Sequence, residues 1–201
     1  MLWPWSSPVP LIALRGRRVL LRLPQMGDYE AWHELRHGSR DFLRPFEPRW
    51  TEADLSRRVF AARVRRAREE AEEGSDYSFF IFTNDAATLV GGITLSNIRR
   101  RAAQFVNLGY WMGQPFAGRG LMSEAVGTSL PFVFDTLDLH RIHAAFLPGN
   151  VASRRVLEKN AFVEEGFAEK YLQINGRWED HVLFGLTKER YETARYTRRL
   201  V

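Results

Sequence analysis

The central stretch of the chain reads Gln104-Phe-Val-Asn-Leu-Gly-Tyr-Trp-Met112, then Gly113-Gln-Pro-Phe-Ala-Gly-Arg-Gly120, then Leu121-Met-Ser-Glu-Ala-Val-Gly-Thr-Ser-Leu-Pro-Phe-Val-Phe134. Its first segment is β-branched, aromatic or apolar at most positions, which predicts a buried strand. Gly118 and Gly120 flank Arg119 where the chain must turn. From Leu121 onward, apolar residues recur at roughly helical spacing, so the last segment is expected to be a helix.

The turn between this strand and this helix is a candidate phosphate site. The first-turn amides of a helix lack partners and carry the positive end of the helix dipole. Glycines beside them allow an anion to approach the backbone closely. The turn matches neither G-x-x-x-x-G-K-[ST] nor a G-x-G-x-x-G that opens the first strand-helix unit. Close packing of the strand on the helix, without a ligand, is the alternative explanation of the glycines.

Length and composition predict one domain with its own core, because 201 residues with 45% hydrophobic content suit a single sizeable unit. The absence of cysteine excludes disulfides, cysteine-ligated metals and a cysteine acyl-enzyme. His33, His37, His140 and His181 show no metal-ligand spacing, so no metal is expected. The first ten residues lack a basic n-region and no segment approaches a membrane span, which favours a cytoplasmic protein.

The chain carries a formal net charge of +5, and its arginines are clustered. One cluster lies between residues 57 and 68, where neighbouring glutamates can pair with it, and another lies in the C-terminal tail. A solvated surface explains this pattern. Attraction to an anion such as a nucleotide cofactor or ribosomal RNA also explains it, and charge alone does not decide between the two.

The remaining elements follow from periodicity and from cap or turn residues. Asp28, Thr51 and Asn150 are expected N-caps, and Gly74 is expected to end the second helix. A bend is expected at Gly91-Gly92, and a loop from Gly38 to Trp50 because its prolines resist helix. Asn175-Gly176 predicts a hairpin turn. The predicted strands are 18–23, 77–82, 89–98, 104–112, 141–147, 162–173 and 177–186, and the other predicted helices are 28–37, 51–73 and 150–160.

From residue 77 to residue 112, short turns and no helix join the predicted strands. This predicts an antiparallel sheet, which is followed by strand-helix units in an α+β fold. The glycine turn is followed by Asn150-Val-Ala-Ser153 and by Glu158-Lys-Asn-Ala-Phe162. In this order the segments resemble the acyl-CoA-binding core of the GNAT superfamily of N-acetyltransferases. Over nearly the whole chain the sequence resembles the RimJ/RimL group, bacterial enzymes that acetylate N-terminal residues of ribosomal proteins.

Several short runs carry the closer resemblance. They are Phe42-Leu-Arg-Pro-Phe-Glu-Pro48, Ser96-Asn97, Leu108-Gly-Tyr110, Gly118-Arg-Gly-Leu-Met122, Glu124-Ala125, His140-Arg-Ile142, Glu165-Gly166 and Asn175-Gly-Arg-Trp-Glu-Asp-His-Val182. Two positions depart from the family pattern. Pro115 replaces the usual Gln or Arg, which removes a side-chain contact but keeps the amide cradle. Ala161 replaces the usual glycine before Phe162.

The resemblance implies one GNAT domain over residues 1–201, with a core at about 14–188 and peripheral segments 1–13 and 189–201. Its mixed, mostly antiparallel sheet would be splayed between the fourth and fifth core strands, 104–112 and 141–147, with a bulge in the former and helices on both faces. Acetyl-CoA is the implied co-substrate. The implied cofactor-binding residues are Tyr110, Trp111, Met112, Ala117, Gly118, Arg119, Gly120, Leu121, Met122, Asn150 and Ser153.

The resemblance also implies catalytic roles. Ser153 would protonate the departing CoA thiolate, and the amide of Trp111 or Met112 would stabilise the tetrahedral oxyanion. Glu47, the only carboxylate between the prolines of its loop, is the leading candidate base, with Asp180 and Glu179 next. His143 is expected to be packed or to point away. Arg154 and Arg155 are expected either to reach the nucleotide phosphates or to lie in solvent.

The implied activity is acetyl transfer to a protein N-terminal α-amino group by direct attack in a ternary complex, with a ribosomal protein as a possible acceptor. A small-molecule amine, such as an amino acid derivative or antibiotic, is an alternative acceptor. A non-catalytic ribosome- or RNA-associated binding protein is a third hypothesis. No membrane association is expected, and the chain would be a monomer or a homodimer.

Overall fold

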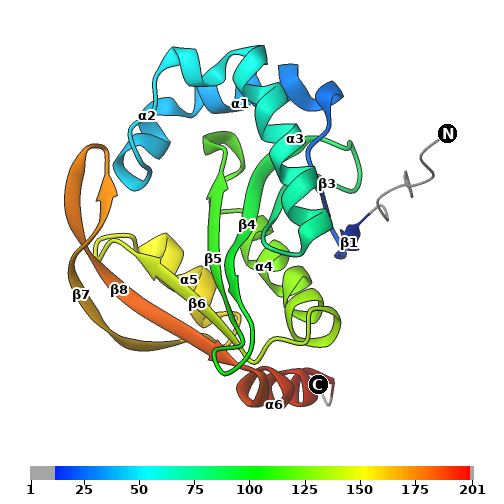
Figure 1. The fold of residues 1–201 in the computed structure, drawn as a ribbon, viewed down its shortest axis with the longest axis vertical. Coiled ribbons are helices and arrows are strands. Elements are labelled where there is room, and N and C mark those ends of the chain that lie inside the picture. The colour runs from blue at the N-terminus through cyan, green and yellow to red at the C-terminus, as the bar shows by residue number, and fades with distance from the viewer. Residues whose placement is uncertain (1–11, 200–201) are drawn as a thin grey trace, which may run out of the picture.

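A computed structural model describes residues 12–199. Its centre is an eight-stranded sheet in the order β1-β2-β3-β4-β5-β6-β8-β7 (Figure 1). All neighbouring strands are antiparallel except β5 and β6, which are parallel. The strands are β1 (Ala13–Arg15), β2 (Val19–Arg22), β3 (Tyr77–Thr83), β4 (Leu89–Arg99), β5 (Phe105–Met112), β6 (Arg141–Phe146), β7 (Val163–Ile174) and β8 (Arg177–Thr187).

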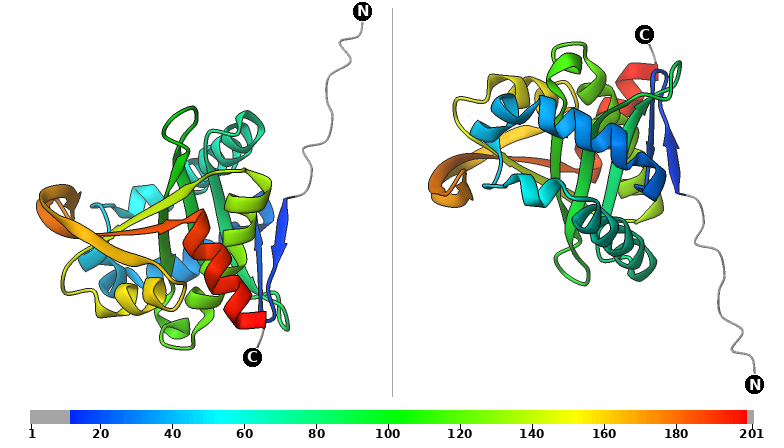
Figure 2. Two further views of the ribbon diagram at one scale, coloured as in Figure 1. Left: turned by 90° about the horizontal axis from the view of Figure 1, so that it is seen from below. Right: turned by 90° about the horizontal axis from the view of Figure 1, so that it is seen from above.

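Helices cover both faces of the sheet, as the mixed α+β prediction required (Figure 2). Trp32, Phe60 and Phe80 belong to a buried cluster that joins α1 and α3 to the sheet. The larger cluster, which includes Val126 and Phe134, joins α4 to the sheet. The helices are α1 (Tyr29–Gly38), α2 (Arg40–Leu43), α3 (Arg57–Glu73), α4 (Leu121–Pro131), α5 (Val151–Glu158) and α6 (Lys188–Arg199), and a π-helical turn (Phe132–Thr136) extends α4.

The predicted splay between β5 and β6 is confirmed. These strands pair only from Phe105 with Arg141 to Asn107 with His143, and the rest of each strand has no partner in this ladder. The predicted bulge is placed wrongly in β5, because the register irregularity lies on β4 between Ser96 and Arg99. Asn97 lies within this irregularity and has a φ of 56°, as expected where a strand contains one extra residue. The wedge therefore opens beside an unbroken β5.

The predicted helix 51–73 is interrupted. Thr51 caps a short 3₁₀ helix (Glu52–Leu55), and its amide donates to the Asp54 carboxylate at 2.7 Å. Ser56 is extended, and α3 begins after it. Gly74, with φ of 69°, ends α3 as predicted. Ser56 interrupts the helix because ψ of 150° at this residue cannot continue a helical turn.

Two other local predictions are wrong for identifiable reasons. Asp28 makes no side-chain cap for α1, because its carboxylate binds the guanidinium of Arg22 and accepts a 2.7 Å hydrogen bond from the amide of Gln25. The loop 38–50 contains α2 and a 3₁₀ turn (Arg44–Phe46). Pro45 lies in the first turn of that 3₁₀ element, where its missing N–H is tolerated. Strand β1 was not predicted.

Strands β7 and β8 form a hairpin that curves away from the rest of the sheet and returns toward α2 (Figure 1). Its predicted turn at Asn175-Gly176 is confirmed, with φ of 45° and 84° at the two residues. The amide of Asn175 donates a 2.8 Å hydrogen bond to the carbonyl of Glu47. The tip of the hairpin is thereby attached to the loop that follows α2.

The predicted peripheral segments are only partly within the described residues. Residues 1–11 and 200–201 lie outside them. At the other end, Tyr191 of α6 is buried and stacks on Phe134 with ring centroids 4.7 Å apart. Arg195 forms a 2.9 Å ion pair with Asp135. The start of the basic tail therefore packs against the π-helical turn.

Candidate active site

A cavity of about 410 Å³ lies where β5, the start of α4 and α5 meet. It gathers residues that are up to 117 positions apart, from Phe42 to Lys159. All predicted cofactor-binding residues except Arg119 line it, together with the predicted catalytic residues Glu47, Trp111 and Ser153. Its lining is Phe42, Leu43, Phe46, Glu47, Tyr110, Trp111, Met112, Phe116, Ala117, Gly118, Gly120, Leu121, Met122, Ser123, Asn150, Ala152, Ser153, Arg155, Val156 and Lys159.

The glycine turn forms the anion-binding end of this cavity. Gly118 and Gly120 have φ of 75° and 76°, a left-handed conformation that only glycine adopts without strain. Gly120 caps α4 without any side-chain hydrogen bond. Within residues 12–199, the amides of positions 118–123 donate no hydrogen bond to a carbonyl or side chain. These amides are therefore available to a phosphate at the positive end of α4.

Arg18 holds this turn in place from the far side. Its Nε lies 2.6 Å from the carboxylate of Glu124, and its guanidinium donates to the carbonyl of Arg119 at 3.2 Å. Burial raises the pKa of Glu124, but the hydrogen bonds and the charge of Arg18 outweigh it and hold that pKa below its ordinary value. Arg18, which immediately precedes β2, thus fixes the position of the turn.

The open edge of β5 supplies amides to the wedge. Gly113 donates to the carbonyl of Val90 at 2.9 Å, which fixes the alternation of hydrogen bonds along β5. By this alternation the Trp111 amide faces β4, whereas the amides of Tyr110 and Met112 face the side from which β6 has diverged. Of the two predicted oxyanion donors, only Met112 therefore has the required direction, and the predicted role of the Trp111 amide does not fit.

Trp111 contributes its side chain to the site instead. A Cβ on Gly92 would lie 2.6 Å from the indole Nε1, and one on Gly91 would lie 2.4 Å from the Trp111 carbonyl. Gly91 and Gly92 thus leave room for this residue. The guanidinium of Arg36 lies 4.9 Å from the Trp111 ring. The indole therefore packs between Gly92 and Arg36 at one side of the cavity.

Tyr110 and Ser153 form a hydrogen-bonded pair at the wedge, with their hydroxyl oxygens 2.6 Å apart. Asn150 caps α5 as predicted, because its side chain accepts from the Ser153 amide at 3.0 Å. Burial raises the pKa of Tyr110 to about 12, against a smaller lowering by the hydrogen bond with Ser153. The phenol therefore stays protonated, and either hydroxyl can donate in this pair.

Glu47 lies between this cavity and a second one of about 290 Å³. Its two carboxylate oxygens accept from Arg36 at 2.6 and 2.7 Å, and one also accepts from the Trp50 indole at 3.0 Å. The second cavity is lined by Trp32, Arg36, Glu47, Pro48, Arg49, Trp50, Asp54, Leu55, Arg63 and Trp111. Glu47 and Trp111 border both cavities, so two bound molecules would meet at these residues.

The comparisons with known proteins agree with this geometry. The Acetyltransferase (GNAT) domain model matches residues 18–163. The chain belongs to the GNAT acetyltransferase family. It is 35% identical over 185 residues to the [ribosomal protein uS5]-alanine N-acetyltransferase of Escherichia coli, covering 91% of this chain and 94% of that protein.

Two solved structures resemble this GNAT acetyltransferase closely. The ribosomal-protein-S5-alanine acetyltransferase of Vibrio fischeri has a TM-score of 0.82 at 29% identity, over 90% of this chain and 98% of that one. Mycobacterium smegmatis RimJ in complex with CoA-disulfide has a TM-score of 0.81 at 30% identity, over 92% and 93%. The predicted fold and the predicted class of enzyme, an N-acetyltransferase, are confirmed.

Other predicted site residues of this GNAT acetyltransferase lie elsewhere. Arg154 binds Glu164 at 2.8 Å and does not line the cavity, whereas Arg155 does. Asp180 accepts from the Lys170 amide at 2.9 Å, and neither it nor Glu179 lines the 410 or 290 Å³ cavity. His143 stacks on Phe105 at 4.7 Å, packed as predicted.

Several residues that line or support the cavity were not predicted. Arg18 is one of them, since its partner Glu124 is 106 positions away. Lys159 and the apolar Phe116 and Val156 also line the cavity. Within residues 12–199, no group of three or more His, Cys, Asp or Glu side chains is arranged to hold a metal ion. No helix in the same range is long and apolar enough to cross a membrane.

Proposed function

We propose that this acetyltransferase transfers the acetyl group of acetyl-CoA to the N-terminal α-amino group of a protein, with a ribosomal protein as the acceptor class. The observation that carries the proposal is the pair of cavities that meet at Glu47 and Trp111. The similarity to the uS5-alanine N-acetyltransferase over 91% of this chain supports the choice of acceptor. Such an acceptor would place the enzyme in the cytoplasm.

The residues of the first cavity fit acetyl-CoA along its length. The free amides at positions 118–123 would bind the pyrophosphate, and Arg155 and Lys159 line the same cavity as candidate phosphate contacts. The amides of Tyr110 and Met112 would pair with the amides of the pantetheine arm or with the thioester carbonyl. When bound, acetyl-CoA supplies the thioester, whose carbonyl carbon accepts the amine.

The acceptor amine must lose its proton to react. A protein α-amino group has a pKa of about 7.7 to 8.0, against about 10.4 for lysine, so a modest proton acceptor is sufficient for an N-terminus. Glu47 would hold the incoming amine and accept its proton directly or through water. Its position beside Arg36 and Trp50 fixes the direction of both carboxylate oxygens.

The chain's own groups complete the transfer. The Met112 amide would donate to the carbonyl oxygen as the C–N bond forms, and a donor of this kind typically contributes two to three orders of magnitude in rate, roughly. As the C–S bond breaks, the Ser153 hydroxyl would give its proton to the thiolate sulfur. Tyr110, at 2.6 Å, would return a proton to Ser153, and solvent would restore the phenol.

A peptide panel tests this function. Alanine-initiated peptides with free and with N-formylated amino termini, each lacking lysine, are incubated with acetyl-CoA, and CoA release and peptide mass are measured. We expect acetylation of the free termini only. Acetylation of small amines without any peptide product would replace the acceptor class with a small molecule.

A thermal-shift measurement tests the donor separately. Acetyl-CoA at about 100 times its dissociation constant should add about 2.7 kcal/mol to the free energy of unfolding. A protein that shows neither this stabilisation nor CoA release, but binds RNA in a salt-sensitive manner, would be a binding protein that retains only the fold.

A further inference from the structure

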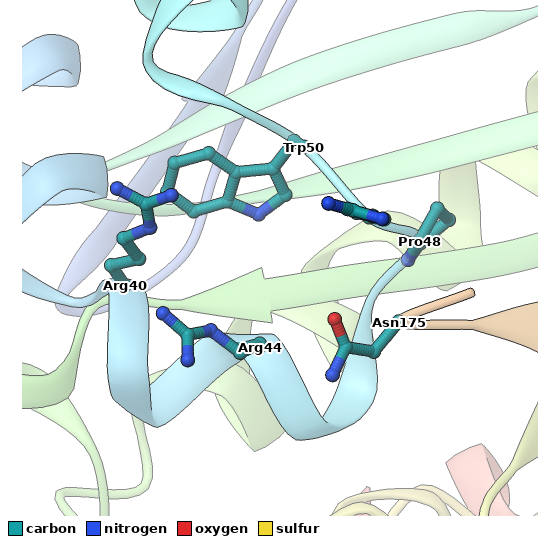
Figure 3. A pocket seen from close by; sticks show the side chains of 6 residues that line it. Arg40, Arg44, Pro48, Trp50 and Asn175 are labelled. Atoms are coloured by element: carbon teal, nitrogen blue, oxygen red, sulfur yellow. The ribbon is translucent and has the colours of Figure 1, made fainter. Parts of the chain in front are cut away.

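A third cavity, of about 320 Å³, lies next to the acceptor side of the active site. Three arginines, Arg40, Arg44 and Arg49, line it together with Pro48, Trp50 and Asn175. Figure 3 shows the Arg40 guanidinium against the Trp50 indole, with the side chains of Arg44 and Asn175 below it. Among residues 12–199, no carboxylate lines it. The cavity is thus cationic, whereas Glu47 and Asp54 line the neighbouring one.

The arginines of this cavity can bind a further anion. Within residues 12–199, Arg49 makes no hydrogen bond or ion pair, and its side chain is exposed. Arg40 pairs with Glu52, and Arg44 lies 3.2 Å from Asp41. These two carboxylates are 53% and 92% exposed, and pairs so open to solvent contribute little free energy. All three guanidinium groups therefore remain available to a ligand.

The walls of the cavity are fixed by contacts to the active site. The Trp50 ring lies 5.3 Å from the Arg40 guanidinium and 4.9 Å from that of Arg36, and its indole donates to Glu47. On the other side, the backbone amide of Asn175 donates to the backbone carbonyl of Glu47. The hairpin tip and the indole thus position this cavity relative to the candidate base.

Neighbouring cavities share lining residues. Glu47 and Trp111 line both the first and the second, and Pro48, Arg49 and Trp50 line both the second and the third. A chain whose amino terminus lies at Glu47 would therefore reach the third cavity by extending along the second. A small-molecule amine would not extend that far.

We propose that the arginine cavity binds the carboxylate of an acidic residue in the acceptor polypeptide, downstream of the N-terminus that is acetylated. Guanidinium groups donate paired hydrogen bonds to a carboxylate, and Asn175 offers a further amide donor. The inference rests on the proposed function, because it uses the direction of an acceptor that starts at Glu47. It names the substrate class more closely: a protein whose N-terminal segment is acidic.

The experiment compares acceptor peptides that share an N-terminal alanine and carry a pair of Glu, Gln or Lys residues, moved stepwise through about positions 3 to 6. A hydrogen bond to a charged group corresponds to about tenfold in an equilibrium, so we expect kcat/KM for the best Glu peptide to exceed that of its Gln counterpart about tenfold. The advantage should shrink as salt rises.

Variants assign the preference to the cavity. In the double variant Arg44→Gln/Arg49→Gln, the ratio of kcat/KM between Glu and Gln peptides should fall toward one, because Arg40 alone keeps its charge and it is paired with Glu52. Arg58→Gln, on the exposed face of α3 and outside all three cavities, is the matched control and should keep the wild-type ratio.

The outcomes separate the two proposals. Equal acetylation of Glu and Gln peptides by the wild type would overturn the acidic-acceptor inference and leave N-terminal acetylation standing. A Glu preference that survives undiminished in the double variant would also overturn it. Absence of acetylation of every free peptide would instead refute the proposed function. Competition by a single-stranded RNA oligonucleotide, lost in the double variant, would assign the cavity to nucleic-acid phosphates and would likewise overturn the inference.

Discussion

The hydroxyl oxygens of Tyr110 and Ser153 lie 2.6 Å apart, at the point where β5 and β6 separate. Tyr110 comes from the strand and Ser153 from the first turn of α5, so this contact joins the two walls of the wedge. Because burial raises the pKa of Tyr110 to about 12, the phenol stays protonated throughout the physiological range of pH. The pair, which is the proposed proton source, therefore keeps one charge state in that range.

Replacement of Ser153 by Ala tests this proton source. Turnover should fall about 10- to 100-fold, because the thiolate loses its donor, while the affinity for acetyl-CoA changes much less. Tyr110→Phe should lower turnover as well and should not shift the pH profile below about pH 10, where tyrosine is neutral. Initial rates across pH with thermal-shift affinities check both; unchanged turnover in Ser153→Ala would remove the residue from the mechanism.

Gly118→Ala tests the phosphate cradle. A Cβ at this position meets no protein atom within 4 Å, so a methyl group would occupy space left for the ligand. We expect acetyl-CoA to bind at least about tenfold more weakly, in addition to a loss of about 1 kcal/mol of stability from the left-handed φ. Binding is measured by calorimetry.

The matched control for the cradle is Gly74→Ala at the end of α3. Gly74 has a similar φ of 69°, and an added Cβ would make only an ordinary contact with Tyr77. This variant should lose comparable stability and bind acetyl-CoA normally. Equal affinities in the two variants would show that position 118 does not approach the ligand.

Glu47→Gln tests the candidate base. The amide keeps the shape of the side chain but cannot accept the proton of the amine, so kcat/KM for a peptide should fall about 100-fold or more. The exposed Glu30, which pairs with Arg57 at 3.0 Å, gives the control Glu30→Gln with little effect. A loss of less than about threefold in Glu47→Gln would exclude it as the base.

Ala161→Gly should stabilise the protein. Ala161 has φ of 65°, where an alanine costs about 1 to 2 kcal/mol relative to glycine, and the greater freedom of glycine in the unfolded chain removes part of the gain. We expect a net increase of roughly 0.5 to 1 kcal/mol in the free energy of unfolding by urea titration. Ala62→Gly in the exposed interior of α3 should instead lose about 1 kcal/mol.

His143 contributes to the acid sensitivity of the fold. Burial, followed by the charge of Arg141, lowers its pKa below the ordinary 6.5, with Glu165 opposing. The unfolded chain therefore takes up a proton near pH 6.5 that the folded state resists, so stability falls as the pH drops below that value. His143→Gln keeps an acceptor for Arg141 and should show a smaller decrease in Tm between about pH 8 and pH 5.

Local sequence signals predicted the parts of the site that depend on neighbouring residues. The glycine turn at 118–120, the Asn150 cap and the hairpin at Asn175-Gly176 each require a particular residue type at one position, and the structure has all of them. The splay of β5 from β6 followed from the family resemblance. These features place most of the predicted cofactor-binding residues around one cavity.

The wrong or missing predictions concern residues whose partners are distant in sequence. Asp28 is a suitable cap by its type, but Arg22 of β2 binds it. Nothing near Arg18 in the sequence indicates that it binds Glu124. Likewise, the Trp111 amide and the Met112 amide are equivalent until the register of β4 against β5 is known. Tertiary pairing decides these positions, and local pattern does not contain it.

Only three residue pairs connect β5 with β6, so the sheet consists of two portions, β1 to β5 and β6 to β8, that share a short seam. A donor molecule lodged in the gap would bond to both portions and act as a brace between them. The bound donor would therefore stabilise the sheet as well as react. Backbone amides along the gap should exchange with solvent deuterium more slowly once it is bound.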